Sequence, residues 1–334
     1  MAGESLIKVK GVNQVCIVVK NLEEVMRNYW NILGIGPWEV YAWEAPLIYD
    51  RTYHGKPAWA REKIAVTQLG KVQLKLCQPI DGDSIYHDYV IENGEGLHHL
   101  NFLVDDVDET TEILTKEGFP SLQSGRWESR EEAGAYNYID IKPTKAIWKP
   151  VHGKIVDAEH SRYPRRAQVS PAKVNVKAIA QVGIVVKNLE EVMRNYWNIL
   201  GIGPWDILEA VPPTLHHRTY RGKPRDFTLR FAFTMVGPVQ LGLVQPVSGD
   251  SSYSDFIMKH GEGLCYIQFI ADDIKETTEM MNKEGFNTLT SAGLSDGGRA
   301  WYDTEDTLKC VWQAFQMPKT MPTTTLYPKL VNAP

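Results

Sequence analysis

The chain has 334 residues, of which 43% are hydrophobic and 23% charged, and its formal net charge at pH 7 is −5. This composition predicts a globular protein with enough apolar material for two cores of about 150 residues each. The negative charge, without runs rich in Lys or Arg, argues against a nucleic-acid partner or an acidic membrane surface. No apolar run approaches the roughly 20 residues of a membrane span, and the N-terminus lacks a signal-peptide core, so we expect a cytoplasmic protein.

The four cysteines, Cys16, Cys77, Cys265 and Cys310, lie in strand-like runs and show no CxxC spacing. They are expected to be small buried hydrophobic residues rather than a disulfide or zinc set. A reducing compartment agrees with this expectation.

One stretch of the sequence occurs twice. Residues 17–38, IVVKNLEEVMRNYWNILGIGPW, return without a change at residues 184–205, an offset of 167 positions. The chain is therefore predicted to be two copies of one domain in tandem. We place the first domain at residues 1–151, a polar linker with two prolines at 152–172, and the second domain, with an extended C-terminal tail, at 173–334.

The first copy opens with a pattern typical of a βαβββ unit. In chain order it predicts a strand at 12–19, a helix at 22–33, a strand at 39–43, a polar loop at 49–57, and strands at 64–68 and 72–77. The helix is amphipathic, and Asn21 and Gly34 suit its N-terminal and C-terminal caps. Gly70 permits the tight turn that joins the last two strands.

A second unit follows in the same copy. After a short helical segment at 87–92, the pattern predicts a strand at 99–104, a helix at 108–117, and strands at 136–140 and 146–148. The second copy repeats this order from residue 181 to residue 315. The expected fold class is α+β, with tandem duplicated domains that each hold two βαβββ units.

These stretches resemble the vicinal-oxygen-chelate superfamily, which includes glyoxalase I, methylmalonyl-CoA epimerase, bleomycin-resistance proteins and extradiol dioxygenases. The matching stretches are VCIVVKNLEEVMRNYWNILGIGPW, VQLKLCQP, GEGLHHLNFLVDDVDE and YIDIKPTKAIW, nearest in pattern to the epimerase-like and glyoxalase-like proteins. The resemblance implies that the two units of each copy curl into a cupped, barrel-like mixed sheet, commonly with a divalent metal inside. It selects no reaction, because the superfamily includes isomerases, lyases, dioxygenases and proteins that only bind.

The resemblance also implies where metal ligands would lie, on the first and last strands of each unit. Those positions are Gln14, Lys75, His99 and Lys149 in the first copy, and Gln181, Gly242, Tyr266 and Gln313 in the second. A divalent ion needs several imidazole or carboxylate ligands, and two lysine ammonium groups would repel it. We therefore predict no cofactor, and a divalent metal held by His99 and Gln14 stays open as the alternative.

The same positions favour chemistry without a metal. Alignment of HLNFLV with QVCIVV places His99 inside the cup, level with Gln14, as a general base or acid. Lys75 and Lys149, if both face inward, would hold an anionic substrate or an enolate oxygen, whereas a one-residue shift of register would leave them in solvent. Tyr266, at the equivalent place in the second copy, is a candidate proton donor. A core role is the alternative for Tyr266 and for His99.

The other candidate residues would bind the substrate. Gln73 shares a strand face with Lys75, so its amide can bond to a carbonyl or hydroxyl group. Arg51, in a basic loop, could clamp a carboxylate, although an exposed turn explains it as well. The predicted substrate-binding residues are Gln14, Gln73, Arg51, Trp148, Gln181, Gln240 and Gln313.

Three functions are consistent with the sequence. The first, which we favour, is an isomerase, epimerase or lyase that moves a proton beside a carbonyl, with His99 as the base and Lys or Gln as the electrophile. The second is a metal-dependent enzyme of the glyoxalase or extradiol dioxygenase type. The third is a binding protein of the bleomycin-resistance type. In each case we expect a small aromatic or anionic carbonyl compound as the partner, chemistry in the first copy, and a homodimer as an option.

Overall fold

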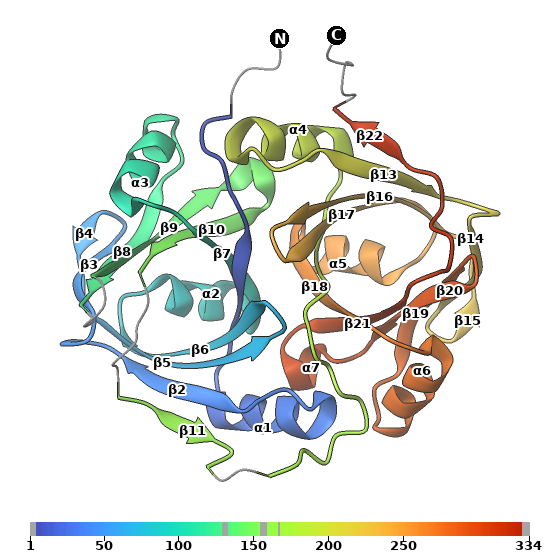
Figure 1. Cartoon of the computed structure of the whole chain (residues 1–334), viewed down its shortest axis with the longest axis horizontal. Coiled ribbons are helices and arrows are strands. Elements are labelled where there is room, and N and C mark those ends of the chain that lie inside the picture. The colour runs from blue at the N-terminus through green and yellow to red at the C-terminus, as the bar shows by residue number, and fades with distance from the viewer. Residues whose placement is uncertain (1–4, 129–132, 154–158, 166–167, 329–334) are drawn as a thin grey trace.

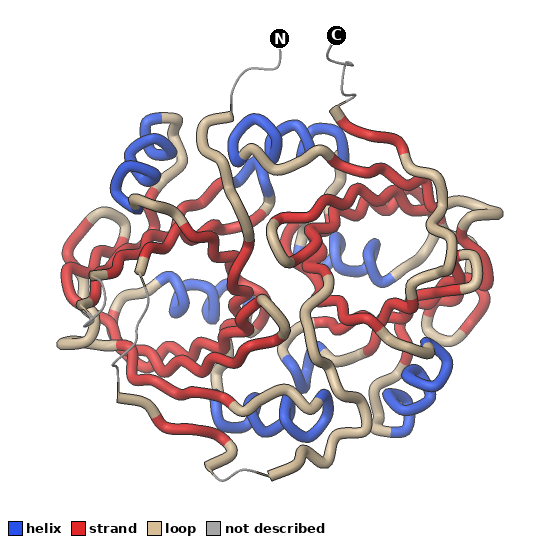
Figure 2. Tube along the Cα trace, in the orientation of Figure 1, coloured by secondary structure: helices blue, strands red, loops and turns tan. Residues whose placement is uncertain are grey.

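The structure, a computed structural model, describes residues 5–128, 133–153, 159–165 and 168–328. It consists of two halves, one from each copy of the repeat, and each half is a sheet that curls around one short helix (Figure 1). That helix is α2 in the first half and α5 in the second, and the strands surround it in both halves (Figure 2). The duplication predicted from the sequence thus appears as two similar cups side by side.

The elements of the first copy follow in chain order: β1 (Val12–Val18), α1 (Leu22–Leu33), β2 (Trp38–Trp43), β3 (Tyr49–Tyr53), β4 (Lys56–Pro57), β5 (Ala60–Leu69), β6 (Val72–Gly82), α2 (Ile85–Asn93), β7 (Gly96–Leu103), α3 (Val107–Lys116), β8 (Ser121–Trp127), β9 (Gly134–Ile141), the 3₁₀ helix η1 (Lys142–Thr144), β10 (Ala146–His152) and β11 (Ser161–Tyr163).

The elements of the second copy are β12 (Gln181–Val185), α4 (Leu189–Leu200), β13 (Trp205–Ala210), β14 (Leu215–Tyr220), β15 (Lys223–Pro224), β16 (Thr228–Val236), β17 (Val239–Ser248), α5 (Ser252–His260), β18 (Gly263–Ile270), α6 (Ile274–Lys283), β19 (Thr288–Leu294), β20 (Gly297–Tyr302), α7 (Glu305–Leu308), β21 (Val311–Gln316) and β22 (Thr325–Tyr327).

Each sheet is built from two blocks that meet at a central seam. The first sheet has the order β11-β2-β5-β6-β1-β7-β10-β9-β8-β3-β4, in which β1 runs parallel to β6 and antiparallel to β7. The second sheet repeats the arrangement, with β12 and β18 at the seam. The predicted α+β fold of two βαβββ units per copy is confirmed, and the sheets are open, since their end strands do not pair with each other in the described residues.

Several segments differ from the sequence prediction. Residues 49–57, expected to be a polar loop, form β3 and β4, and β3 pairs with β8. The sequence prediction omitted strands β8 and β19, because Ser, Thr and Gly obscure the alternation of apolar and polar side chains. In the structure, the third, fifth and seventh residues of each strand are buried. The predicted linker contains β11, which pairs with β2, while its residues 154–158 and 166–167 lie outside the described residues. In the tail, β22 pairs with β13.

The two copies share one hydrophobic core. Helix α1 lies beside α7 of the second copy (Figure 1), and Tyr29 of α1 donates its hydroxyl proton to the Leu308 carbonyl at 2.8 Å. The equivalent Tyr196 of α4 donates to the Thr144 carbonyl at 2.9 Å. Trp312 packs edge-on against Tyr29, with ring centroids 6.0 Å apart. The contacts are reciprocal, as expected when a symmetric interface joins two copies of one domain.

The segment that precedes each copy crosses to the other copy. The Val9 amide donates to the Leu200 carbonyl at the end of α4, and the Val176 amide donates to the Leu33 carbonyl at the end of α1, both at 2.9 Å. Figure 1 shows the N-terminal arm beside α4 and the segment before β12 near α1. These arms satisfy carbonyl groups that a helix end leaves unpaired, so each copy completes the other.

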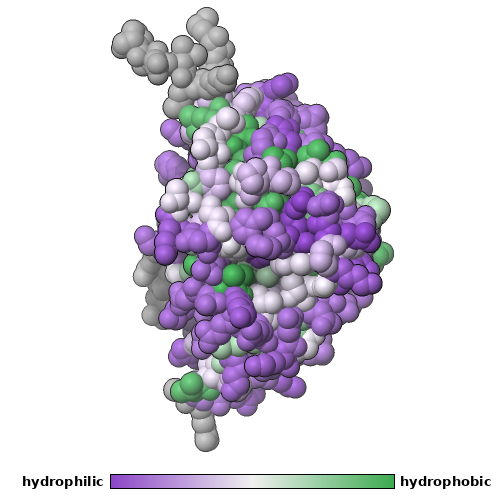
Figure 3. Space-filling model, turned by 90° about the vertical axis from the view of Figure 1, so that its right-hand side faces the viewer, coloured by the Kyte–Doolittle hydropathy of each residue, from purple (hydrophilic) through white to green (hydrophobic). Residues whose placement is uncertain are grey.

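The outer surface is mainly polar on the face seen in Figure 3. Hydrophilic residues cover most of that face, and hydrophobic residues form small, separate patches. Among the described residues, none of the helices has both the length and the apolar character needed to cross a membrane.

Substitution of Tyr29 and Tyr196 tests how much their hydroxyl groups stabilise the contact between the copies. Tyr29 also accepts a hydrogen bond from Trp312 Nε1 at 3.2 Å, whereas Tyr196 has the Thr144 carbonyl as its partner in the described residues. We expect Tyr196→Phe to lower the free energy of unfolding by about 1 kcal/mol and Tyr29→Phe by about 2 kcal/mol, because Tyr29→Phe leaves two buried groups unpaired. Urea unfolding measures both. Equal effects would contradict the unequal hydrogen bonding.

Candidate functional site

A row of polar side chains crosses the inner face of the first sheet. Gln14 on β1 is level with Gln73 on β6 and with Asn101 on β7, and Asn101 is level with Lys149 on β10. Gln14 Nε2 donates to Gln73 Oε1, and Asn101 Nδ2 donates to Gln14 Oε1 at 2.8 Å. All four side chains line a cavity of about 480 Å³ inside the first cup, which we call the first cavity.

A second row lies two residues further along the strands. Cys16 is level with Lys75 on β6 and with His99 on β7. Lys75 lines the first cavity, whereas His99 is fully buried beside it and is not part of its lining. The prediction that His99 is level with Gln14 is wrong: equivalent residues of two antiparallel strands need not be cross-strand partners, and Asn101 takes that place.

Lys75 and Lys149 are buried and neither is ion-paired in the described residues, although the Glu39 carboxylate also lines the first cavity. Their exposed fractions are 2% and 5%, and neither forms an ion pair with a carboxylate in the described parts of the chain. Lys75 Nζ donates to the Tyr86 hydroxyl at 3.3 Å, and Lys149 Nζ lies 4.8 Å from the ring centroid of Tyr136. Because burial of an unpaired positive charge is strongly unfavourable, a pair of lysines in one cavity favours an anionic ligand.

Burial sets the protonation of the groups around the first cavity. Burial and, after it, the nearby Lys75 ammonium lower the pKa of Lys149 well below its ordinary value of 10.5. Burial raises the pKa of both Tyr86 and Tyr138 well above 10.0, so their hydroxyl groups stay protonated. These two hydroxyl groups share a hydrogen bond of 2.5 Å. The cavity therefore combines a lysine of weakened basicity with neutral hydrogen-bonding groups.

His99 lies beneath this layer and is coupled to its neighbour His98. The Nδ1 atoms of the two rings are 2.8 Å apart, the His99 ring centroid is 4.9 Å from that of Tyr138, and His99 Nε2 has no hydrogen-bond partner in the described residues. Burial, His98 and the two lysines lower the pKa of His99 well below 6.5, and burial lowers the pKa of His98 to about 3. Both rings are thus neutral at pH 7, and one Nδ1–H donates to the other Nδ1, so His99 Nε2 keeps a lone pair able to accept a proton when His99 is the donor.

Two predicted substrate-binding residues, Arg51 and Trp148, are not part of the lining of the first cavity. Arg51 Nη1 donates to Glu62 Oε2 at 2.9 Å, and both side chains are buried, so this pair braces β3 against β5. Trp148 precedes Lys149 and therefore faces the opposite side of β10. There it packs against Tyr196 of the second copy, with ring centroids 6.0 Å apart.

The second cup has a smaller cavity of about 240 Å³ and a different set of polar groups. Gln181 Nε2 donates to Gln240 Oε1 at 2.5 Å, as in the first copy. Tyr266, fully buried, donates its hydroxyl proton to Gln181 Oε1 at 2.7 Å. Gln313 is also fully buried and donates to the Tyr253 hydroxyl at 3.0 Å. The predicted residues of the second copy thus bond mainly to each other.

Asn101 and Arg299 are among the polar residues of the cups that the sequence prediction did not include. Asn101 lies two residues after His99, so strand alternation alone could have placed it on the same face. Arg299, in the second cup, lies between two rings, 4.4 Å from the centroid of Phe231 and 5.2 Å from that of Phe315. Nothing in its local sequence marks it, because its neighbours are distant along the chain.

The residues of the first cavity do not fit a metal ion. In the part of the chain that the structure describes, no group of three or more His, Cys, Asp or Glu side chains could hold one. Of the positions implied by the resemblance, Gln14 offers one amide oxygen that already accepts a hydrogen bond from Asn101. Lys75 and Lys149 bring positive charge, and His99 lies outside the lining. This donor set disfavours a divalent cation.

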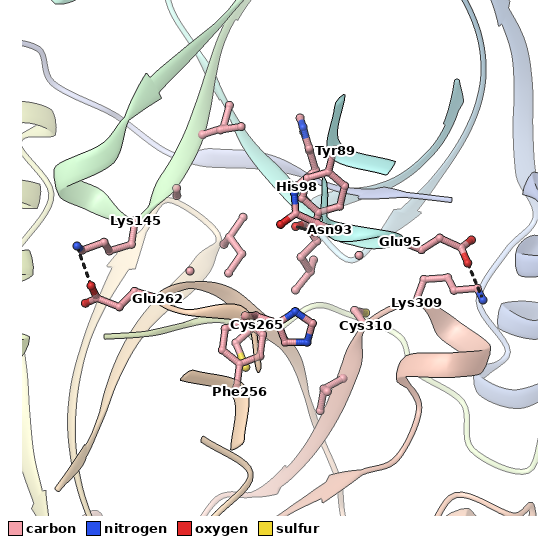
Figure 4. A pocket seen from close by; sticks show the side chains of 18 of the residues that line it. Tyr89, Asn93, Glu95, His98, Lys145, Phe256, Glu262, Cys265, Lys309 and Cys310 are labelled. Carbon is pink, nitrogen blue, oxygen red and sulfur yellow. Dashed lines mark hydrogen bonds and ion pairs between the residues drawn. The ribbon is translucent and has the colours of Figure 1, made fainter. Parts of the chain in front are cut away.

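Another cavity, of about 370 Å³, lies between the two copies (Figure 4). Two equivalent ion pairs border it: Lys145 Nζ to Glu262 Oε2 at 2.9 Å, and Lys309 Nζ to Glu95 Oε2 at 3.0 Å. His98 also lines it. Since each lysine at this border has its own carboxylate, the interdomain cavity lacks the uncompensated charge of the first cavity.

Comparison with known proteins gives one family and one fold. The model of the Glyoxalase/Bleomycin resistance protein/Dioxygenase superfamily matches residues 13–137 and 180–302. An uncharacterized protein of Bacillus subtilis (strain 168), YqjC, is 25% identical over 104 residues, which cover 31% of this chain and 64% of that protein. The chain thus spans less than two thirds of that relative's length.

Two solved structures share the architecture. A mutant of 4-hydroxymandelate synthase from Streptomyces coelicolor superposes with a TM-score of 0.59 and 15% identity, over 93% of each chain. A fusion of a xylose isomerase-like TIM barrel with a 4-hydroxyphenylpyruvate dioxygenase superposes with a TM-score of 0.52 and 12% identity, over 96% of this chain and 51% of the fusion. At these identities the likeness concerns the fold alone.

Lys149→Met tests the cost of burying a second ammonium group. The folded-state pKa of Lys149 lies below the unfolded value near 10.5, so between these two values the unfolded chain binds more protons and wild-type stability rises with pH. We expect Lys149→Met to be more stable than wild type at neutral pH, with the difference shrinking as the pH approaches 10.5. Urea unfolding at neutral and alkaline pH measures this. Lys142→Met, at a lysine whose side chain is 82% exposed, is the control. A Lys149→Met variant less stable than wild type at neutral pH would contradict the expectation.

Proposed function

Since the chain belongs to the glyoxalase/bleomycin resistance protein/dioxygenase superfamily, we propose that its first cavity binds a small, planar, anionic carbonyl compound and moves a proton beside the carbonyl. One observation carries the proposal: Lys75 and Lys149 line one cavity, are buried, and have no carboxylate partner in the described residues. A bound anion would supply the missing opposite charge. Trp43, Trp127 and Tyr41 also line the cavity, which suits a planar ligand.

The lysine pair takes the part that a metal plays elsewhere, as the group that stabilises negative charge on the ligand oxygen. We assign the proton acceptor to His99, whose Nε2 has no hydrogen-bond partner among the described residues. The two lysines lower the pKa of His99, so an anion bound between them offsets part of that effect and makes His99 a stronger base. His99 lies outside the cavity lining, with the Tyr138 ring centroid 4.9 Å away, so proton transfer to it requires a relay or a movement of the side chains around it.

The class of ligand follows from charge and shape. The two structural neighbours are named for small aromatic acids, 4-hydroxymandelate and 4-hydroxyphenylpyruvate, which supports aromatic acids as first probes and nothing more specific. An aromatic 2-oxo acid has a carboxylate for the lysines, a planar ring for the aromatic wall, and an acidic C–H beside its carbonyl. We therefore choose phenylpyruvate as the probe.

A binding protein without turnover is the second candidate. It is favoured by the position of His99, which is fully buried and outside the cavity lining. In that case the lysines hold the same anion and no proton moves. Affinity therefore does not separate the two candidates, whereas proton exchange does.

Exchange of the proton beside the carbonyl of phenylpyruvate, followed by proton NMR in D₂O, tests the first candidate. We expect wild type to accelerate exchange above the buffer rate, and His99→Ala to lower this acceleration roughly a hundredfold or more, the usual size of a general-base contribution. Lys75→Met should weaken phenylpyruvate binding about tenfold or more, because it removes a charged partner of the anion. The surface variant Lys142→Met should match wild type. Tight binding without accelerated exchange would favour the second candidate, and absence of binding would contradict both.

Removal of metal ions gives an independent prediction. We expect exchange by the purified protein to survive exhaustive treatment with a chelator, because the lysine pair rather than a divalent ion stabilises the ligand oxygen. The same exchange assay measures it before and after treatment. Loss of exchange with chelator, restored by a divalent ion, would replace this mechanism by the metal-dependent alternative.

A further inference from the structure

The two lysines of the first cavity differ in their surroundings. Lys75 Nζ donates to the Tyr86 hydroxyl at 3.3 Å and also lies 5.8 Å from the Trp43 ring centroid, so its position is fixed. Lys149 Nζ lies over the Tyr136 and Tyr138 rings, at 4.8 and 5.1 Å, and donates no hydrogen bond to an acceptor in the described residues. The Lys75 amino group is thus held by a hydrogen-bond acceptor, whereas the Lys149 amino group has none in the described residues.

We propose that Lys149 is a nucleophile that forms a Schiff base with the carbonyl carbon of the ligand, while Lys75 holds the ligand's anionic group. This inference rests on the proposed function, because it concerns the same cavity and the same class of ligand. It goes further because the group that withdraws electrons would be bonded to the ligand. An iminium nitrogen, rather than a nearby ammonium group, would withdraw electrons from the carbon that loses its proton.

The position of the two amines supports this division. Lys149 projects from β10 level with Asn101, and Lys75 projects from β6 level with Cys16, on the other side of β1. The two side chains therefore enter the first cavity from opposite sides of β1, at positions two residues apart along the strands. A compound whose carboxylate and carbonyl are separate groups can contact one lysine with each.

The electrostatics of the site favour a free amine on Lys149. An amine attacks a carbonyl only when unprotonated, and enzymes obtain this state by burying a lysine or placing it beside another cation. Both conditions hold here: burial lowers the pKa of Lys149 most, and the neighbouring Lys75 lowers it further. The faces of Tyr136 and Tyr138 favour the ammonium form instead, but a cation–π contact is the weaker effect.

Other titratable groups around Lys149 come from each strand packed near it. They are Cys16 on β1, Glu62 on β5, Lys75 and Cys77 on β6, His99 on β7, and Tyr136 and Tyr138 on β9. Glu62 is engaged with Arg51, and burial raises the pKa of each thiol and tyrosine hydroxyl, which keeps them neutral. Lys75 is therefore the principal neighbouring charge that acts on Lys149.

The covalent step balances without an added oxidant or reductant. The lone pair of Lys149 Nζ forms a bond to the carbonyl carbon, the carbonyl π electrons move to oxygen, and a proton passes from nitrogen to that oxygen. The resulting hydroxyl takes one more proton, from solvent, and leaves as water while the nitrogen lone pair forms the C=N bond, so Lys75 keeps its contact with the anionic group. A proton then leaves the adjacent carbon to His99, which gives an enamine, and His99 or solvent returns a proton to the same carbon. Water adds to the iminium carbon and the C–N bond breaks with its electron pair on nitrogen, which releases the carbonyl compound, the free amine of Lys149 and one proton to solvent.

Reductive trapping tests the inference directly. The full-length protein is incubated with 4-formylbenzoate, an aromatic aldehyde with a carboxylate, and sodium cyanoborohydride, which reduces an imine to a stable amine. Peptide mass spectrometry then measures the adduct at each lysine. At mildly acidic pH, where ordinary lysines are protonated, we expect at least roughly tenfold more adduct at Lys149 than at exposed Lys142, since each pKa unit changes the free amine about tenfold.

Two variants serve as controls. Lys149→Arg keeps a positive charge and removes the nucleophile, so it should lose the dominant adduct and transfer none of it to Lys75. Lys75→Met removes the neighbouring cation and a partner of the carboxylate. At saturating 4-formylbenzoate, adduct formation at Lys149 should therefore fall at acidic pH and recover at alkaline pH, a pH dependence that a purely structural role would not produce. Adduct spread over surface lysines of the wild type, unchanged by Lys149→Arg, would overturn the inference.

The two proposals can fail separately. Accelerated exchange of phenylpyruvate without an adduct at Lys149 would overturn the Schiff base and leave the proposed function in place. An adduct at Lys149 without accelerated exchange would support the nucleophile and contradict the proton transfer.

Discussion

The pairing of β1 with β6 on one side and with β7 on the other decides which side chains face the first cup. Alternate residues of a strand face opposite sides, so the register that directs Gln14 and Lys75 inward also directs Val15 and Leu74 outward. Val15 and Leu74 are fully buried in the shared hydrophobic core. A shift by one residue would bury the polar set in that core and expose the apolar set, which makes the register strongly specified. The buried lysines are therefore a consequence of the same pairing that builds the core.

The outer face of each sheet is completed by the other copy, which explains where the repeated sequence is identical. Helices α1 and α4 have the same twelve residues, and they make the same contacts. Asn28 donates to the Thr307 carbonyl at 3.1 Å, and Asn195 donates to the Pro143 carbonyl at 3.0 Å. A helix that packed only on its own sheet would not need its outward polar residues. Here Asn28 and Asn195 make equivalent contacts with the other copy. Substitution of either residue would therefore remove one hydrogen bond between the copies.

Local signals in the sequence predicted the elements, whereas contacts between distant residues remained out of reach. Asn21 caps α1 by accepting from the Glu24 amide, and Gly34 ends it with φ +66°, as its sequence indicates. The cross-strand partner of His99 was not predictable in this way, because an antiparallel pairing depends on where two strands meet rather than on what each contains. Arg51 likewise meets Glu62 only after β3 and β5 have folded together.

The two cups differ because small residues in the second make room for large ones. Gly183 stands where the first copy has a cysteine, and a Cβ there would lie 1.9 Å from the Tyr266 ring. Gly242 replaces Lys75, and a Cβ there would lie 2.7 Å from the Gln181 side chain. The tyrosine and the glutamine thereby fill a cup whose cavity is about 240 Å³, against about 480 Å³ in the first. The larger space and the two buried lysines occur together in the first cup, and this combination supports the proposal that the anion binds in that copy.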